Sequence, residues 1–384
     1  MKVLALTSIR SEYDLLSPLF FKLEQASDIE LKLLVGGAHN SPSFGLTCND
    51  IRNDGLDILI EIESLLDSDS PAGRLKSASI LLLSAIDVVK TYNPDLILYA
   101  GDREEVMIGA LLGGYLSIPT VHFYGGDHAA DGHIDNPIRH AVSKLSTCHF
   151  VCTEEHRERL LSIGEPSHRI FTIGSIALDK FHTFNAIDNI KCLVAGAEVT
   201  KPSAILIYHP IEEEQGQFKE IVDAMICSLN SAGYHCFIGL PNSDPGNTDI
   251  RNALQEAVKQ YGDVTLYGNL SRDYFLSLFK SSSIIVGNSS AGLLEAASLP
   301  IPCVNVGARQ RGRFCGDNVT FVGTDLHMIK EGILNASSHE HLSSIENMSN
   351  PYGVGDSAQK AYNLIKSIDF KTLRAKKEDP LTNG

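Results

Sequence analysis

The chain lacks several features that would assign it at once to a class of protein. None of its eight cysteines belongs to a CxxC pair, and most lie within apolar runs. We therefore expect reduced thiols, no zinc site and a cytoplasmic protein. The run ILLLSAIDVV from Ile80 is too short and too interrupted to span a membrane. MKVLALTSIR at the N-terminus has no small-residue cleavage site behind it, which predicts a first strand and not a signal peptide.

Positive charge is also scarce. The 32 Lys and Arg residues are outnumbered by 47 Asp and Glu residues, which gives a net charge of −15. Binding to nucleic acid or to an anionic membrane needs a positive field, so we expect neither partner. A small anion held by a local arginine or a helix N-terminus remains compatible with this charge.

Two nucleotide-binding motifs are absent as well. The chain contains neither GxGxxG nor GxxxxGK[ST], so the sequence supports neither a dinucleotide site nor a P-loop. Short-period repeats and low-complexity tracts are also missing. These absences matter because the rest of the pattern is that of Rossmann-like sheets, which would otherwise suggest a dehydrogenase.

Strand-like runs alternate with segments of helical length along the 384 residues, which are enough for two domains. The alternation predicts parallel, doubly wound α/β sheets. A polar stretch near Phe181–Ser203 separates two such series. We expect an N-terminal domain at 1–180, a C-terminal domain at 181–365 whose last helix packs back on the first domain, and a charged, frayed tail at 370–384.

The stretch Thr120–His140 combines a strand with a dense set of ionisable residues. TVHFY ends at Gly125-Gly126, and Asp127, Asp131 and Asp135 follow with interleaved histidines. Parallel sheets bind ligands where their strands end, which favours a site here. The alternative is a polar surface loop in which Asp135 caps the next helix.

Other polar residues follow other predicted strands. Arg10 and Asp102 follow strands of the first domain, and His209 follows the first strand of the second. SIIVGNSSAGLLE predicts a strand, a turn and a helix start that could bind a phosphate, with Glu295 placed to accept hydrogen bonds from a ribose. The alternatives are a surface arginine, a structural histidine, a serine N-cap and a solvent-exposed glutamate.

These motifs together resemble the hydrolysing UDP-N-acetylglucosamine 2-epimerases of sialic-acid biosynthesis. The resemblance rests on SIRSEYD (8–14), AGDRE (100–104), GGD followed by IDNPIRHAVSKLS (125–146), IYHP (207–210), GNSSAGLLE (287–295) and NVGARQRGR (305–313). It implies a glycosyltransferase-B-like fold of two Rossmann-like domains facing across a cleft that holds a nucleotide sugar. It implies no cofactor, no required metal, a UDP-sugar and UDP as ligands, and a homodimer or homotetramer.

The resemblance also implies roles for individual residues. Asp102, Asp127 and Asp135, which lies four before Arg139, fall at catalytic acids, and His209 falls near the leaving diphosphate. The substrate-binding positions are Arg10, Asn288, Ser289, Ser290, Glu295 and Arg313. Many similar enzymes have Glu where this chain has Asp127, and the HAADGH loop is unusual. Both lie on the sugar side, so a 2,4-diacetamido-trideoxy sugar nucleotide is an alternative substrate.

The expected reaction is elimination of UDP to a 2-acetamidoglucal, followed by addition of water with inversion at C2. It requires carboxylic acids in different protonation states, because proton removal and proton delivery both occur. One rival hypothesis is a non-hydrolysing epimerase of the same fold. The motif SIRSE, in place of the GTRPE typical of that branch, favours hydrolysis. A glycosyltransferase of the same fold, or a non-catalytic nucleotide-sugar binder, is the rival from another class.

Overall fold

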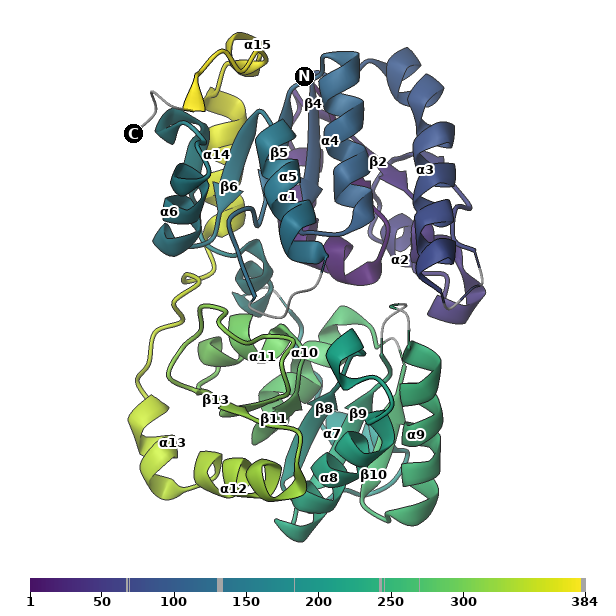
Figure 1. Ribbon diagram of the computed structural model, residues 1–384, viewed down its shortest axis with the longest axis vertical. Coiled ribbons are helices and arrows are strands. Elements are labelled where there is room, and N and C mark those ends of the chain that lie inside the picture. The colour runs from purple at the N-terminus through teal and green to yellow at the C-terminus, as the bar shows by residue number, and fades with distance from the viewer. Residues whose placement is uncertain are drawn as a thin grey trace. The chain divides into compact units, whose positions relative to one another are not determined.

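A computed structural model gives the arrangement of the chain (Figure 1) and describes residues 1–66, 68, 70–129, 134–182, 184–241, 244, 246–268 and 270–380. The chain forms two compact units. Unit 1 contains Met1–His128, the segment that ends at Lys180, and the C-terminal segment from Tyr352. Unit 2 contains Phe181–Pro351 and also Ala129, which follows directly on His128. The chain passes into the long segment of unit 2 after Lys180 and returns to unit 1 at Tyr352.

Unit 1 is built on a parallel sheet. Its described strands, in the order β3-β2-β1-β4-β5-β6-β7, number seven. Their bounds are β1 Lys2–Thr7, β2 Glu30–Val35, β3 Ile58–Glu61, β4 Leu96–Ala100, β5 Thr120–Phe123, β6 Cys148–Val151 and β7 Ile170–Thr172. The strand order reverses between β1 and β4, which pair directly. In doubly wound sheets this reversal opens a crevice at the carboxyl ends of the strands, where ligands bind.

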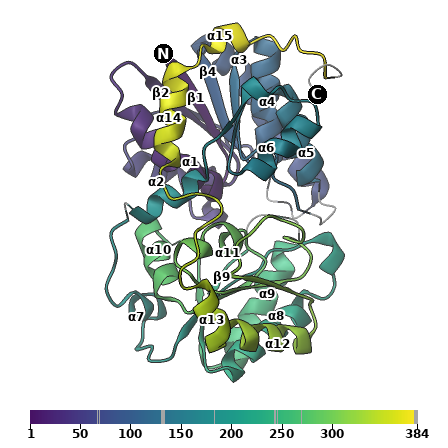
Figure 2. The same cartoon turned by 90° about the vertical axis from the view of Figure 1, so that its left-hand side faces the viewer.

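Helices cover both faces of the unit 1 sheet, so its central strands are almost completely buried and mostly apolar. Leu4 and Leu6 of β1 pack with Leu81 and Val89 from α3 on one face. On the other face α14 lies beside α1 (Figure 2). The helices are α1 Arg10–Glu24, α2 Cys48–Asn53, α3 Pro71–Tyr92, α4 Glu104–Leu116, α5 Asp135–Leu145, α6 Glu154–Ser162, α14 Ser357–Ser367 and α15 Phe370–Leu373.

Unit 2 has the same kind of sheet, and its described strands run in parallel in the order β10-β9-β8-β11-β12-β13. The strands are β8 Ser203–Ile207, β9 His235–Gly239, β10 Val264–Tyr267, β11 Ile284–Gly287, β12 Cys303–Val306 and β13 Val319–Val322. The helices are α7 Ile190–Ala195, α8 Phe218–Ser231, α9 Asn247–Gln260, α10 Arg272–Ser281, α11 Ala291–Leu294, α12 Leu326–Ala336 and α13 His339–Ile345. Here the order reverses between β8 and β11, which pair directly.

Two Rossmann-like parallel α/β units confirm the fold expected from the sequence. The sequence analysis did not predict the edge strands β3 and β13. Each pairs with a neighbour on one side, and both are partly exposed along their length. A strand that buries little apolar surface leaves a weak signal in the sequence. In the part of the chain that the structure describes, no helix is long and apolar enough to cross a membrane.

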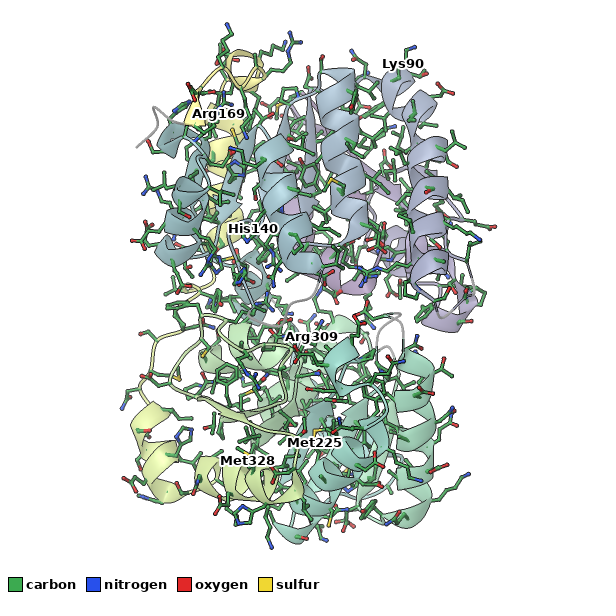
Figure 3. All side chains as sticks on the ribbon, in the orientation of Figure 1. Lys90, His140, Arg169, Met225, Arg309 and Met328 are labelled. Atoms are coloured by element: carbon green, nitrogen blue, oxygen red, sulfur yellow. The ribbon has the colours of Figure 1, made fainter. Side chains whose placement is uncertain are left out.

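The C-terminal segment is held firmly by unit 1 as far as the structure describes it. The guanidinium of Arg169, a buried side chain near α15 (Figure 3), donates to the carbonyl oxygens of Leu373 and Ala375 and to the Glu378 carboxylate. Lys376 Nζ lies 2.6 Å from Oε2 of the buried Glu165. The expectation of a frayed tail is therefore wrong for residues 370–380, because its charges find buried partners. Residues 381–384 lie outside the described part of the chain.

Candidate active site

Two candidate residues of unit 1 lie where the strand order reverses. Arg10 is the first residue of α1, three residues past the end of β1, and its Nε is 3.6 Å from Asp14 Oδ2. Asp102 follows β4 after a single glycine. Because β1 and β4 are hydrogen-bonded neighbours, the fold brings the segments carrying Arg10 and Asp102 to the same edge of the sheet. This is the edge at which doubly wound sheets bind ligands.

Arg139 of α5 connects the segments that carry two of the candidate acids. Its Nη2 donates to Asp102 Oδ2, and its Nη1 donates to the main-chain oxygen of Asp127 over 2.8 Å. The same nitrogen lies 3.4 Å from Asn136 Oδ1. Arg139 is almost fully buried, whereas the side chain of Asp102 keeps about a quarter of its surface exposed. One planar cation therefore fixes the positions of both segments, a task for which the rigid guanidinium suits arginine.

Asp135, the third candidate acid, opens α5. The helix cap position is Ile134, which supplies no side-chain hydrogen bond, so Asp135 does not act as the N-cap. Its Oδ1 lies 3.4 Å from Arg74 Nη2, and Arg74 also donates through Nε to Glu104 over 2.7 Å. Asp135 thus belongs to an ion-pair group that joins α3, α4 and α5 in unit 1.

Asp127 lies in a buried turn after β5. Its side chain is 5% exposed, and its Oδ1 accepts a 2.8 Å hydrogen bond from the His128 amide. The His128 ring stacks on His140 with ring centres 5.6 Å apart, and burial lowers the pKa of His140. Asp131, which the sequence places in the same loop, lies outside the described residues, as does His133. Asp127 is therefore a buried carboxyl group with imidazole side chains nearby.

Two further carboxylates, Glu12 on α1 and Glu105 on α4, are buried near these residues and were not predicted from the sequence. Oε2 of Glu12 accepts a 2.9 Å hydrogen bond from the Ser8 amide, while Oε1 has no hydrogen-bond partner among the described residues. Burial, aided by the Glu105 charge, raises the pKa of Glu12 to about 8. Burial, aided by the Glu104 charge, raises the pKa of Glu105 to about 7.

These raised pKa values predict a loss of stability at alkaline pH. The folded protein holds protons on Glu12 and Glu105 more tightly than the unfolded chain does. Their ionisation therefore costs stability as pH rises from about 4.5 through about 8, and the cost is absent at lower pH. Glu12→Gln should remove a cost on the order of a few kcal/mol at pH 9 and change little at pH 5.

The measurement is the free energy of unfolding by urea at several pH values. Glu158→Gln, an exposed change on α6, is the matched control and should follow the wild type at every pH. Parallel pH profiles for the wild type and Glu12→Gln would show that the carboxyl pair does not titrate in this range.

In unit 2 the candidate residues lie at the equivalent reversal, between β8 and β11. Asn288 is fully buried, and its amide bridges the two strand ends. Its Oδ1 accepts from the His209 amide over 2.7 Å, and its Nδ2 donates to the His209 carbonyl over 2.8 Å. Both groups of the Asn288 side chain thus hold the backbone of His209, whose own side chain is half-buried.

The close approach of the two strands at this point requires a glycine. Gly287 has a φ of 127°, and a Cβ there would lie 2.1 Å from the Ile207 carbonyl oxygen. A side chain at position 287 would therefore push β8 away from β11 and separate His209 from Asn288. Ser289 and Ser290 follow at once, both half-buried.

The helix after these serines is much shorter than the sequence suggested. α11 has four residues, and a separate 3-10 turn, η6 Ala296–Ser298, follows it. Pro300 limits how far the helix can continue, because proline disfavours helical geometry in the residue before it. A helix of one turn has only a small dipole, so an anion at Ser289 and Ser290 would depend mainly on hydroxyl groups and nearby cations. Glu295, buried, lies just past the end of α11.

The loop after β12 contributes further polar side chains to this edge of unit 2. Arg309 Nη1 and Gln310 Nε2 both donate to the Asn288 carbonyl, over 3.1 and 3.0 Å. Arg313 Nη1 donates to Gln310 Oε1 over 2.6 Å. Figure 3 labels Arg309 at the end of unit 2 opposite α12. The sequence analysis singled out Arg313 but gave Arg309 and Gln310 no separate role, although they lie in the segment NVGARQRGR.

Glu214 holds the loop after β12 in place and was also not predicted to be buried near the site. Its Oε1 accepts from the Ala308 amide over 3.0 Å, and its Oε2 accepts from the Tyr208 hydroxyl. The run EEE at 212–214 is typical of a solvent-exposed turn, yet Glu214 is buried, and burial raises its pKa. Nothing in the run EEE distinguishes the buried Glu214 from its exposed neighbours Glu212 and Glu213, so its burial could not be predicted.

None of the groups of His, Cys, Asp and Glu in the described ranges has the geometry of a metal site. A metal-independent reaction stays a prediction.

Comparison with known proteins identifies the family. The profile "UDP-N-acetylglucosamine 2-epimerase" matches residues 21–366. This chain belongs to that family. It is 33% identical over 368 residues to the UDP-N,N'-diacetylbacillosamine 2-epimerase (hydrolyzing) of Legionella pneumophila, covering 96% of each chain. It is 29% identical over 340 residues to the UDP-N-acetylglucosamine 2-epimerase of Neisseria meningitidis serogroup B, covering 88% of each.

Solved structures of the family share the fold. The UDP-GlcNAc 2-epimerase from Neisseria meningitidis, bound to UDP-GlcNAc, matches with a TM-score of 0.81 at 21% identity. The match covers 96% of this chain and 100% of that one. At 21% identity this match establishes the fold alone, which is glycosyltransferase-B-like and is made of the two parallel-sheet units described above.

Proposed function

We propose that this protein is a hydrolysing 2-epimerase that releases UDP from UDP-N,N'-diacetylbacillosamine and inverts C2 of the sugar. The observation that carries the proposal is the arrangement of acids in unit 1. Arg139 holds Asp102 and the Asp127 backbone, while Asp135 opens the same helix. An enzyme that only transfers a sugar needs one base, whereas proton removal and return at C2 need a base and an acid.

The first step of the proposed reaction is an elimination. A carboxylate takes the proton from C2, a double bond forms between C1 and C2, and the bond from C1 to the glycosidic oxygen breaks. The electron pair leaves with UDP, whose growing negative charge needs nearby donors and cations. In the second step a carboxylate takes a proton from water, the resulting hydroxyl group adds to C1, and an acid delivers a proton to the opposite face of C2.

The residues divide between these tasks by unit. Asp102, Asp127 and Asp135 of unit 1 are proposed to share the proton transfers, and Arg10 to contact a phosphate. In unit 2 we assign the diphosphate to His209, Ser289 and Ser290, and the ribose to Glu295. Asn288 positions His209, and the loop with Arg309, Gln310 and Arg313 lines the nucleotide. The two hydrogen bonds between the Asn288 side chain and the His209 backbone support this assignment, because they fix the backbone of the histidine before the diphosphate binds.

Two relatives support the diacetamido sugar as the substrate. Besides the Legionella enzyme, the GDP/UDP-N,N'-diacetylbacillosamine 2-epimerase (hydrolyzing) of Campylobacter jejuni is 32% identical over 83% of each chain. The unusual loop after Asp127, which the sequence analysis linked to this substrate, agrees with that choice. UDP-N-acetylglucosamine, the substrate first expected from the sequence, becomes the second candidate, supported by the Neisseria meningitidis relative.

The deciding experiment supplies each sugar nucleotide alone to the purified protein. We expect UDP and a free 2-epimerised diacetamido sugar from UDP-N,N'-diacetylbacillosamine, with slower turnover of UDP-N-acetylglucosamine and of the GDP-linked sugar. In D₂O the product should carry deuterium at C2. In H₂¹⁸O the UDP should remain unlabelled, because C1–O breaks and the P–O bond does not.

Each other outcome excludes part of the proposal. An epimerised sugar still attached to UDP would identify a non-hydrolysing epimerase. Label in the UDP would exclude the elimination route. Turnover that requires an added acceptor would identify a glycosyltransferase, and no turnover of any of the three nucleotides would refute the proposed function.

Binding of UDP gives a separate prediction for unit 2. Glu295→Ala should weaken UDP affinity by about 1–3 kcal/mol, the scale for losing a hydrogen bond that involves a charged group. Isothermal titration calorimetry measures it directly. Glu331→Ala, an exposed change on α12 of the same unit, is the control and should bind UDP normally. Unchanged affinity in Glu295→Ala would remove Glu295 from the nucleotide site.

A further inference from the structure

His156 is a buried histidine of unit 1 that the proposed mechanism does not use. It is the third residue of α6, the helix that follows β6 in the chain, and its side chain is 1% exposed. Thr153 is the N-cap of this helix, and its hydroxyl accepts from the His156 amide over 3.2 Å. The cap fixes the first turn of α6 and with it the direction in which the imidazole points.

The first turn of α6 also packs against the Gly125-Gly126 turn that precedes Asp127. Gly126 has a φ of 79°, and a Cβ there would lie 2.2 Å from the His156 carbonyl oxygen. Arg159, one turn further along α6, donates to the Gly126 carbonyl. Only a glycine can sit this close to the helix with this backbone conformation. The contact therefore sets the distance between His156 and the residue after Gly126.

That residue is Asp127, and its carboxylate faces the imidazole. His156 Nε2 lies 3.5 Å from Asp127 Oδ1, and both side chains are almost completely buried. This separation is longer than a hydrogen bond of about 2.7–3.2 Å, and a small side-chain rotation would close it. Apo enzymes often hold such pairs slightly apart, and the hydrogen bond tightens when substrate binds.

The other groups around the pair explain why its geometry matters. Arg139 and His140 approach from α5, His128 from the loop, and Arg159 with its partner Glu155 from α6. The Tyr352 ring lies 6.0 Å from the His156 ring. Asp127 already accepts from the His128 amide on Oδ1. An imidazole N–H directed at the same oxygen would hold the carboxyl group in one orientation.

We infer that His156 is a positioning residue for Asp127, which it orients through Nε2 so that the carboxyl group presents one oxygen to the reacting carbon. The inference rests on the proposed function, in which Asp127 transfers a proton. It adds a residue to which neither the sequence motifs nor the resemblance gave a role. Asp–His pairs in other enzymes work by the same principle, because a buried hydrogen bond holds the partner in one orientation.

Three substitutions separate positioning from packing. Gln places an amide nitrogen where Nε2 stands, Asn places one nearer to Nδ1, and Leu keeps bulk without any donor. We expect His156→Leu and His156→Asn to lower kcat about 10–100-fold with KM within about twofold, the scale for losing a group that orients a functional residue. His156→Gln should keep at least about a third of wild-type kcat. Equal losses in the Gln and Leu variants, or normal kcat in the Leu variant, would overturn the inference.

A second readout does not depend on turnover. In protein labelled with ¹⁵N-histidine, His156→Gln identifies the His156 Nε2 resonance by its loss. Asp127→Asn should then shift that resonance, whereas Asp50→Asn, an exposed change on α2, should not. An unmoved resonance would overturn the inference even if the enzyme is active. A shifted resonance in a protein that turns over no sugar nucleotide would retain the pairing and refute the proposed function instead.

Discussion

Release of UDP from the sugar nucleotide should fall about 10²–10⁴-fold in Asp127→Asn, the usual contribution of one general acid or base. Asn has nearly the size of Asp and keeps an oxygen that accepts from the His128 amide, so the turn should fold normally. It cannot take up or deliver a proton at this position. UDP affinity should hardly change, because the proposed nucleotide ligands belong to unit 2. The loss should therefore appear in kcat and not in binding.

The comparison with neighbouring acids makes this test specific. Asp135→Asn should reduce turnover in a similar way, since we propose that Asp135 shares the proton transfers. Asp131→Asn, which changes a residue outside the described part of the chain, matches no catalytic position of the family motif and should keep much of the activity. Near-normal turnover by a folded Asp127→Asn protein would show that Asp127 is a turn residue, a role that Asn fills equally well.

The sequence was sufficient to predict the fold because its central strands are buried on both faces. The central residues of runs such as KVLALT and SIIVGN are apolar, and polar residues follow within two positions. The reversal points of the two sheets lie at Arg10 and Asp102 in unit 1 and at His209 and Asn288 in unit 2. A residue that follows a strand in a parallel sheet has a predictable place, because all carboxyl ends share one edge.

What the sequence could not supply is the pairing between residues far apart in the chain. Glu12 and Glu105 read as surface acids in the first turns of two helices, yet both are buried together where those helices begin. Their burial follows from the pairing of β1 with β4, which no local pattern encodes. The length of α11 escaped prediction for a different reason, because the residues AGLLEAAS at 291–298 fit a helix as well as two short turns.

Among these long-range contacts, those of Arg139 have the largest predicted effect on stability and turnover. It is buried, and its partners are Asp102 and the carbonyl oxygen of Asp127. Arg139→Met should lower the free energy of unfolding by about 3 kcal/mol, near the lower end of the range for breaking a buried ion pair, because Asp102 remains partly exposed. Turnover should fall at least about 10²-fold, since neither acid would keep its position. Urea unfolding and UDP release measure the two losses.

A double substitution shows whether these two losses have one cause. In Arg139→Met the instability arises from the Asp102 carboxylate, which is left without its cation in a partly buried place. Adding Asp102→Asn removes that charge, so the double variant should regain much of the lost stability. Its turnover should stay low, because Asp102 is itself a proposed proton-transfer residue and Asp127 still lacks the donor to its carbonyl oxygen. If the double variant is no more stable than Arg139→Met, the ion pair is not the source of the instability. If it regains turnover, the placement of Asp102 and Asp127 by Arg139 is not required for the reaction.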